Sequence, residues 1–505
     1  CFPWGYSLFQ TTPERALLIA QTLKLAFPRV KEMAVYVRDS RDIDMVAAFW
    51  PDLQALKLVR WHQRPINQPD EAGGLGMEFQ FLMQTCKSLR NIDLSDFYCW
   101  SEDIPHALQV EPSVSRNLES LSLMKISDGF KASELEAITN ACMNLEELRL
   151  VLLFDPRLLD FVDNDALLSL GARCKRPRVL HLVDSKEFNR GRAGEPEDGP
   201  VDAEIGKHGL IGMFQALPLL EDLAIMLSQN VHDAALILEA LGTHCKRLMT
   251  LSLGHFQGLC KGPQPDGLAM CSGLTELVIK NCADLDDIGL SSIATGNKKL
   301  RKLELHCCRG ITKDGLHIVT HRLWRTLVDV RVSCCFQLSS IDTLWALQPI
   351  QGTIEELHID GIVDRDFLSR QAEIKAMERH LGPSSSSSSD KLQENGTRCP
   401  SPKSCPLSAD VPNSTNGDPA SIIADKLDVG MTKNNFDSNS PESTVGDDGI
   451  DNIRTTHSAV EIETISKCPC LNPEISDFSL SFCEREWSRL KCLSLWIPIG
   501  ELLSP

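Results

Sequence analysis

The sequence has no run of lysines and arginines and no apolar stretch of membrane-spanning length. Its formal net charge is -18, from 51 Lys and Arg against 69 Asp and Glu. Nucleic-acid binding draws on clustered cations that displace counterions from phosphates, so we expect no nucleic-acid partner. A membrane helix needs about 18 to 20 successive apolar residues, and a secretory signal needs an apolar core behind a basic start. Neither pattern occurs in the sequence, and we expect a protein that is neither inserted in a membrane nor secreted.

The sequence signatures of common enzyme classes are also missing. It contains no Gly-rich phosphate loop, no Gly-x-Ser-x-Gly nucleophile elbow and no His-Glu-x-x-His metal pair. Each of these supplies a specific reacting or ligand-holding group at a fixed spacing. The sequence therefore predicts a protein that is not an enzyme.

The 19 cysteines do not suggest a disulfide framework. Most of them recur at one position of a repeat, and the pairs Cys307-Cys308 and Cys334-Cys335 are adjacent in the chain. This pattern indicates reduced thiols that serve as small, buried, apolar side chains. A zinc site is the alternative and fits best at Cys468-Pro469-Cys470, although no second pair stands at the spacing of a zinc finger.

The dominant pattern is a leucine-rich repeat. A chain of 505 residues is too long for one ordinary core, which favours several domains or a repeat array. Cys142 is followed at offsets of three, six and eight by Leu145, Leu148 and Leu150, the opening of such a repeat. The frame returns at Cys245, Cys271, Asn297 and Trp324, and more weakly at Phe27, Trp50, Cys86, Leu118, Leu217, Gln351 and Trp487. From position 220 the first leucine recurs at 248, 274, 300, 327 and 354, which are intervals of 28, 26, 26, 27 and 27 residues.

Each repeat is predicted to be a strand, a turn and a helix. In the stretch from Asp286 to Ala294, for example, Ile288, Leu290 and Ile293 suit one buried helix face together with Ala294. One unit cannot bury its own apolar face, so neighbours stack. We expect an α/β leucine-rich-repeat solenoid, a horseshoe or superhelix, with a curved parallel sheet on the concave face and helices on the convex face.

Alternation along the strands predicts which side chains point out of the concave face of the sheet. The leucines of each Leu-x-Leu pair point into the core, and the residue between them points outward. The predicted concave positions share no single chemistry: Lys57, Asp93, Ser122, Arg149, His181, Ala224, Ser252, Val278, Glu304, Arg331, His358 and Ser494.

Two long intervals interrupt the repeat spacing. The interval of 43 residues from Pro177 to Leu220 contains an acidic loop with Gly and Pro around 189–202. The interval of 136 residues from Ile354 to Leu490 contains a stretch rich in Ser, Asn, Asp and Pro, whose composition buries too little apolar surface to offset its ordering entropy. We predict repeats over 1–382, a disordered insertion over 383–470 and a resumed, truncated repeat over 471–505.

Loops at the repeat edge supply candidate partner-binding residues. Arg60, Trp61, His62 and Arg64 directly follow one repeat strand and have the composition of a binding hot spot. The alternative is that Trp61 packs on the next repeat. Tyr98 and Trp100 follow another strand and either contact a partner or fill the core between repeats. Two arginines of the concave row, Arg149 and Arg331, complete the candidates.

Several strings resemble a known family more closely than the generic repeat does. The Asp-x-Gly-Leu start of a helix at Asp287 to Leu290, with Asp314 to Leu316 as a second copy, is similar to F-box leucine-rich-repeat proteins. Five further strings resemble the plant F-box proteins of strigolactone and karrikin signalling: Arg60 to Arg64, Leu94 to Tyr98 with Trp100, Glu102 and Asp103, Phe154 to Arg157, Phe256 to Gly258, and Leu493 to Ile497.

The resemblance implies a nuclear substrate receptor of an SCF-type ubiquitin ligase. It implies binding to an α/β-hydrolase hormone receptor and to a repressor protein, and recruitment of a Skp-type adaptor and cullin through an F-box. We expect that F-box before residue 1 and the family's last repeats after residue 505. Related hormone receptors hold an inositol phosphate on a basic concave floor, which the concave positions above do not supply. We therefore expect no cofactor and no metal.

Two other classes remain open on the sequence. One is a generic intracellular leucine-rich-repeat scaffold, which sequence upstream of Cys1 would separate from an F-box protein. The other is a repeat protein of the GTPase-activating type, which would speed hydrolysis by a small GTPase.

Overall fold

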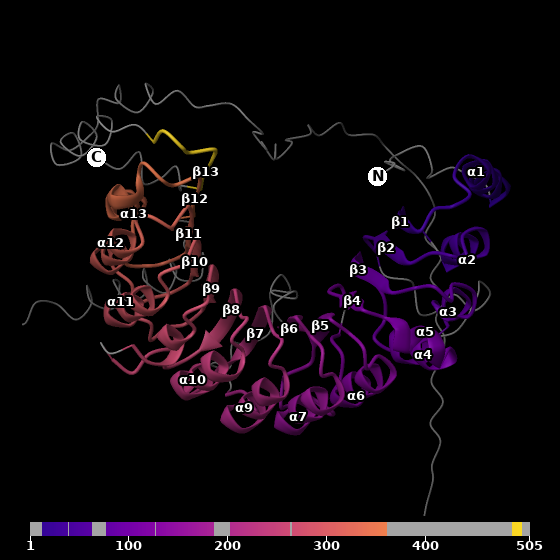
Figure 1. Ribbon diagram of the computed structural model, residues 1–505, viewed down its shortest axis with the longest axis horizontal. Helices are drawn as coiled ribbons and strands as arrows, with labels where there is room; N and C mark the ends of the chain where they lie inside the picture. Colours follow the sequence, from indigo (N-terminus) through magenta and orange to yellow (C-terminus); the bar gives the residue numbers. More distant parts are fainter. Residues whose placement is uncertain are drawn as a thin grey trace, which may run out of the picture. The chain divides into compact units, whose positions relative to one another are not determined.

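The structure is a computed structural model that describes residues 13–38, 40–62, 77–126, 128–185, 202–262, 265–360 and 487–496. Within these ranges the strands form one sheet in which every strand pairs in parallel with the next strand along the chain, from β1 to β13. Figure 1 shows the helices along one side of this sheet. The predicted α/β leucine-rich-repeat solenoid is confirmed.

The strands are short and occur one to a repeat. They are β1 (Glu32–Tyr36), β2 (Ala55–Arg60), β3 (Asn91–Phe97), β4 (Ser120–Leu123), β5 (Glu147–Leu152), β6 (Val179–Asp184), β7 (Asp222–Val231), β8 (Thr250–Phe256), β9 (Glu276–Lys280), β10 (Lys302–His306), β11 (Asp329–Ser333), β12 (Glu356–Asp360) and β13 (Cys492–Trp496).

Apart from α1, which precedes β1, the helices follow strands in the chain, and they form the second layer. They are α1 (Pro13–Ala26), α2 (Ser40–Phe49), α3 (Gln80–Thr85), α4 (Asp103–Val110), α5 (Pro112–Asn117), α6 (Ala132–Ala141), α7 (Asn164–Arg173), α9 (Lys207–Ala216), α10 (Ala234–His244), α11 (Asp287–Gly296), α12 (Lys313–Arg322) and α13 (Ser340–Ala346), with short 3-10 helices η2 (Gly267–Met270) and η3 (Gln348–Ile350). None of these helices is both long and apolar enough to cross a membrane.

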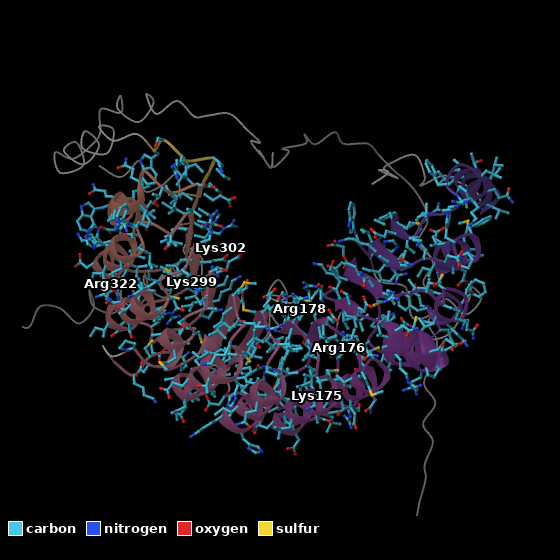
Figure 2. All side chains as sticks on the ribbon, in the orientation of Figure 1. Lys175, Arg176, Arg178, Lys299, Lys302 and Arg322 are labelled. Carbon is cyan, nitrogen blue, oxygen red and sulfur yellow. The ribbon has the colours of Figure 1, made fainter. Side chains whose placement is uncertain are left out.

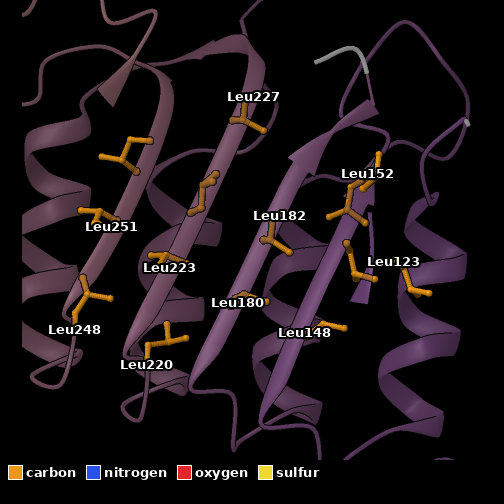
Figure 3. Close-up of a cluster of buried hydrophobic side chains, with 14 of the residues drawn as sticks. Leu123, Leu148, Leu152, Leu180, Leu182, Leu220, Leu223, Leu227, Leu248 and Leu251 are labelled. Atoms are coloured by element: carbon orange, nitrogen blue, oxygen red, sulfur yellow. The ribbon is translucent and has the colours of Figure 1, made fainter. Parts of the chain in front are cut away.

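The repeat leucines form the core between the two layers. Leu148, Leu180, Leu223 and Leu251 are fully buried and occupy the same register position on β5 to β8. Figure 3 shows these leucines in a row across neighbouring strands. Since no repeat can bury such a row alone, each strand depends on its two neighbours for stability.

Helix α11 shows how a repeat helix begins and which face it buries. The carboxylate of Asp286 accepts a hydrogen bond from the Gly289 amide at 2.8 Å, a cap that satisfies a free N–H of the first turn. Leu290 and Ile293 are buried against the sheet, but Ile288 is 54% exposed. The expectation that Ile288 shares the buried face is wrong, because at about 100° per residue its side chain points away from the face centred on Leu290 and Ile293.

The predicted concave positions form one continuous row. Each pairs in register with its counterpart on the next strand, from Lys57 opposite Asp93 to His358 opposite Ser494. The predicted register of this row is confirmed for all of its members, although the side chains of Ser122 and Ala224 are buried. We call the side of the sheet that carries this row, away from the helices, the strand face.

Neither long interval breaks the sheet. Strand β6 pairs directly with β7, and β12 pairs directly with β13. The repeat therefore resumes near Trp487, as the sequence predicts. Most of the acidic loop, the insertion over 383–470 and the Cys468-Pro469-Cys470 string lie outside the described residues.

The cysteines of the repeat position are free thiols in the core. Cys142, Cys174, Cys245 and Cys271 are buried and unpaired. Burial raises the pKa of Cys271 to about 12, so this thiol stays protonated and unreactive at neutral pH. The prediction of reduced, buried, apolar cysteines is confirmed for this position.

Candidate partner-binding surface

The charged side chains of the strand face are paired with one another. Arg149 lies 2.8 Å from Glu147 and the ring of His181 lies 3.0 Å from Asp222. Glu304 lies 3.4 Å from Lys280 on the preceding strand. The strand face therefore presents a mosaic of compensated charge instead of a field of one sign.

Lys57 and Asp93 show how ion pairs on the strand face shift the pKa values of their members. Lys57 lies 2.9 Å from Asp96 and 3.2 Å from Asp93. The hydrogen bond to Asp96 is the main reason why the pKa of Lys57 is raised. Burial alone would raise the pKa of Asp93, but hydrogen bonds from Ser95 and Lys57 lower it below its usual range. Both groups therefore stay charged at neutral pH.

Some of the basic residues near two other repeats are also paired with carboxylates. Figure 2 labels Lys175, Arg176 and Arg178 in one group, and Lys299, Lys302 and Arg322 in another. Arg178 lies 2.8 Å from Glu221, and Lys302 lies 3.7 Å from Glu276. Arg178 and Lys302 are therefore partly neutralised, whereas Lys175 and Arg322 donate to the backbone carbonyls of Gly171 and Ser291.

Arg60 is a structural residue and not a surface contact. Its side chain is 1% exposed, and its guanidinium donates to Glu78 at 2.9 Å and to the Tyr98 carbonyl at 2.7 Å. The guanidinium also lies over the Phe97 ring, 4.0 Å from the centroid. The expectation that Arg60 belongs to a contact surface is wrong, because its guanidinium is buried and already paired with Glu78 and the Tyr98 carbonyl.

Trp61 and His62 lie on the surface directly after β2. Trp61 is 75% exposed, and its ring meets the ring of Tyr36 edge-on with 5.7 Å between centroids. The alternative that Trp61 packs into the next repeat is therefore wrong. His62 is also exposed, and Arg64 lies outside the described residues.

Tyr98 lies at the same edge, one repeat further on. Its amide donates to the Arg60 carbonyl at 3.1 Å, and its half-buried ring lies 5.6 Å from the Lys125 ammonium. Tyr36, Trp61 and Tyr98 thus follow or end three successive strands at one edge of the sheet; we call them the aromatic edge. Trp100 is half-buried and lies three residues before the start of α4, so it is less exposed than Trp61.

The two arginines predicted on the strand face are separate from the aromatic edge. Arg149 is on β5, and Arg331 on β11 lies 3.1 Å from Asp329 and 2.9 Å from Glu356. The structure does not bring either arginine together with Trp61. A partner that contacts all the candidates must therefore span several repeats.

Sequence reasoning missed Glu78, Tyr36 and Lys125. Glu78 lies in no repeat frame, and its pairing with Arg60 joins positions 18 residues apart. Tyr36 stands one residue after the last aliphatic of its frame and lies opposite Val59 of β2, whereas Arg60 lies opposite Phe97 of β3. Tyr36, Trp61 and Tyr98 stand at different offsets from the last aliphatic of their frames, so the repeat frame alone does not reveal the edge.

The fold and this surface define a leucine-rich-repeat protein. No family model matches the sequence. F-box protein MAX2 homolog A from Petunia hybrida is 41% identical over 368 residues, which are 72% of this chain and 51% of that protein. F-box protein MAX2 homolog B from the same plant is 34% identical over 516 positions, which cover 100% of this chain and 64% of that protein. F-box protein MAX2 from Arabidopsis thaliana is 37% identical over 367 residues, or 71% and 52% of the two chains.

The chain belongs to the MAX2 family of F-box proteins. It spans 51%, 64% and 52% of the length of these three relatives.

Proposed function

We propose that the chain is the repeat region of a substrate-receptor subunit of an SCF-type ubiquitin ligase. The subunit acts in the nucleus, in strigolactone or karrikin signalling. It binds an α/β-hydrolase hormone receptor and a repressor protein, and the ligase ubiquitinates the repressor. A Skp-type adaptor and cullin are recruited through an F-box, the module after which the relatives are named. The subunit itself contributes binding and no catalysis.

The observation that carries this proposal is the kinship with MAX2 F-box proteins along the whole repeat array. The surface chemistry supports it. The strand face carries charges of both signs in ion pairs, which suits a protein partner. Charged side chains of the partner can pair with these charges in place of their present partners, at little cost in desolvation. A continuous sheet of thirteen strands also offers a surface long enough for two partners at once.

We place the hydrolase receptor at the aromatic edge. Trp61 is the most exposed of the aromatic side chains there, and its ring is held in place by Tyr36. Buried behind it, the Arg60–Glu78 pair fixes the backbone that carries Trp61. A large aromatic on a rigid support loses little entropy on binding, which is the property of a hot spot.

The test is the affinity of the purified 505-residue chain for the hydrolase receptor, measured with and without hormone. Trp61→Ala should weaken hormone-dependent binding by tenfold or more, as expected for a hot spot worth about 2 kcal/mol. Trp324→Ala is the matched control, because Trp324 is 47% exposed but directly follows α12 and lies far along the sheet from β2. It should bind like the wild type.

Equal loss for both tryptophan variants would show that the aromatic edge is not the contact. No binding of the receptor under any condition would contradict the proposed partner. Acceleration of GTP hydrolysis by a small GTPase in the presence of the chain would favour the alternative class.

A further inference from the structure

A second cluster of functional side chains lies at the same edge of the sheet, far from Trp61. His306 ends β10, Cys307 follows it, and Cys334 follows β11. A ring nitrogen of His306 and the two Sγ atoms all lie within 4.8 Å of one another, and all three residues are half-buried. The cluster is therefore reachable from solvent but held by two adjacent repeats.

The backbone at this edge is a feature of the repeat. Cys307 and Cys334 both have a φ of 53°, and their amides donate to the carbonyls of Ser333 and Asp360 at 2.9 Å. His255 and Asn281 occupy the equivalent positions of the two preceding repeats, with φ values of 62° and 55°. Four successive repeats thus share this left-handed residue, and only two of them place cysteine there.

The second cysteine of each adjacent pair has a separate role. Cys308 and Cys335 are buried in the core, as is Cys282, which follows Asn281 in the preceding repeat. These three account for one core cysteine per repeat. Cys307 and Cys334 are additional to that pattern, and core packing does not explain them.

We propose that His306, Cys307 and Cys334 form a binding site for a soft divalent cation of the zinc class. Thiolate and imidazole are the ligands that zinc prefers, and zinc bond lengths of about 2.0 to 2.3 Å place tetrahedral ligands about 3.5 to 3.8 Å apart. Side-chain rotations alone can bring the present spacing to that range. With three protein ligands, the fourth position takes water or a donor from a partner.

The surroundings support a cation. Asp360 ends β12, the next strand along the sheet, and its carbonyl accepts the hydrogen bond from the Cys334 amide. The cation replaces thiol protons, and the Asp360 carboxylate adds negative charge beside it. This inference is independent of the proposed ligase function, since it depends only on three side chains.

The test is titration of the full, reduced, metal-free chain with Zn²⁺, followed by native mass spectrometry, and with Co²⁺, followed by absorption spectroscopy. We expect one cation per chain and the charge-transfer absorption of cobalt thiolate. Losing an outer-shell partner costs about 10- to 100-fold in affinity, so Cys334→Ser should weaken binding by about 100-fold or more. His306→Asn should weaken it similarly, and circular dichroism checks that both variants fold.

Two control variants locate the metal. Cys492→Ser removes an exposed thiol outside the cluster and should leave binding unchanged. The double variant Cys468→Ser and Cys470→Ser removes the other candidate ligand pair of the sequence and should also bind like the wild type.

Three results would overturn the proposal. The first is loss of the cation in the Cys468 and Cys470 variant with retention in Cys334→Ser. The second is equal affinity of the wild type and both cluster variants. The third is the absence of any bound cation in the reduced chain, with a Cys307–Cys334 disulfide forming on oxidation.

Discussion

The repeats that carry β1 to β4 differ from those that carry β8 to β12 in their regularity. In the later repeats the first leucine recurs every 26 or 27 residues, whereas from Val30 through Leu53 and Leu89 to Leu118 the intervals are 23, 36 and 29. The interval of 36 holds the exposed Trp61 and the buried Glu78, and β2 and β3 shift register between Lys57 and Val59. Residues beyond the minimal repeat thus build the aromatic edge and its buried support, whereas the later repeats keep a uniform spacing.

The largest expected loss of stability comes from the Arg60–Glu78 pair in the irregular repeats. Glu78→Ala should lower the free energy of unfolding by about 3 to 5 kcal/mol, because it leaves the buried Arg60 cation without its carboxylate. Urea denaturation followed by circular dichroism measures the change. Glu111→Ala, which removes the carboxylate of an exposed pair with Lys87, is the control and should leave the unfolding midpoint nearly unchanged. Similar midpoints for the two variants would mean that Arg60 is not buried.

A leucine of the regular region gives the next largest effect. Leu303→Ala should cost about 2 to 5 kcal/mol through lost burial and the cavity that remains between stacked repeats. Its neighbour Glu304 faces outward and pairs at 3.4 Å with Lys280, whose side chain is partly exposed, so Glu304→Ala should be nearly silent. Melting curves of the two variants check the strand register. Equal losses of melting temperature would reject it.

The smallest expected effect is the pH-dependent contribution of Asp93, on β3 of the strand face, to the stability of the fold. The folded-state pKa of Asp93 is lowered, so its contribution to stability is present above its unfolded pKa of about 3.9 and is lost as the pH falls through the folded value. The two side chains are partly exposed to solvent, and Asp93→Asn should therefore cost less than about 1 kcal/mol at pH 7. The difference from the wild type should disappear in acid. A difference that grows below pH 4 would contradict the assigned sign.

The sequence predicts the regular part of the fold well, and long-range pairings poorly. The Leu-x-Leu frame fixes which residues alternate inward, and since stacking preserves that frame, the whole row from Lys57 to Ser494 could be predicted. The Arg60–Glu78 pair could not, because no periodicity links an arginine at the end of a strand to a glutamate before a short helix. Ile288 shows a third case. Its apolar side chain fits a helical pattern, but the start of α11 at the Asp286 cap decides which face meets the sheet.

The aromatic edge was only partly predictable for the same reason. Trp61 and Tyr98 stand out by composition in a chain with 3 tyrosines and 8 tryptophans. That they lie at one edge depends on the register of three strands and on Tyr36. The contact of Tyr36 with Trp61 forms only when β1 and β2 pair.

Hydrogen–deuterium exchange on the chain with the hydrolase receptor tests the central claim most directly, by locating the contact along the array. With hormone present, we predict slower exchange at the carboxyl ends of β1 to β3 around Tyr36, Trp61 and Tyr98, with unchanged exchange in the helices α10 to α12. Protection confined to those helices, or no hormone-dependent protection of the aromatic edge, would contradict the account.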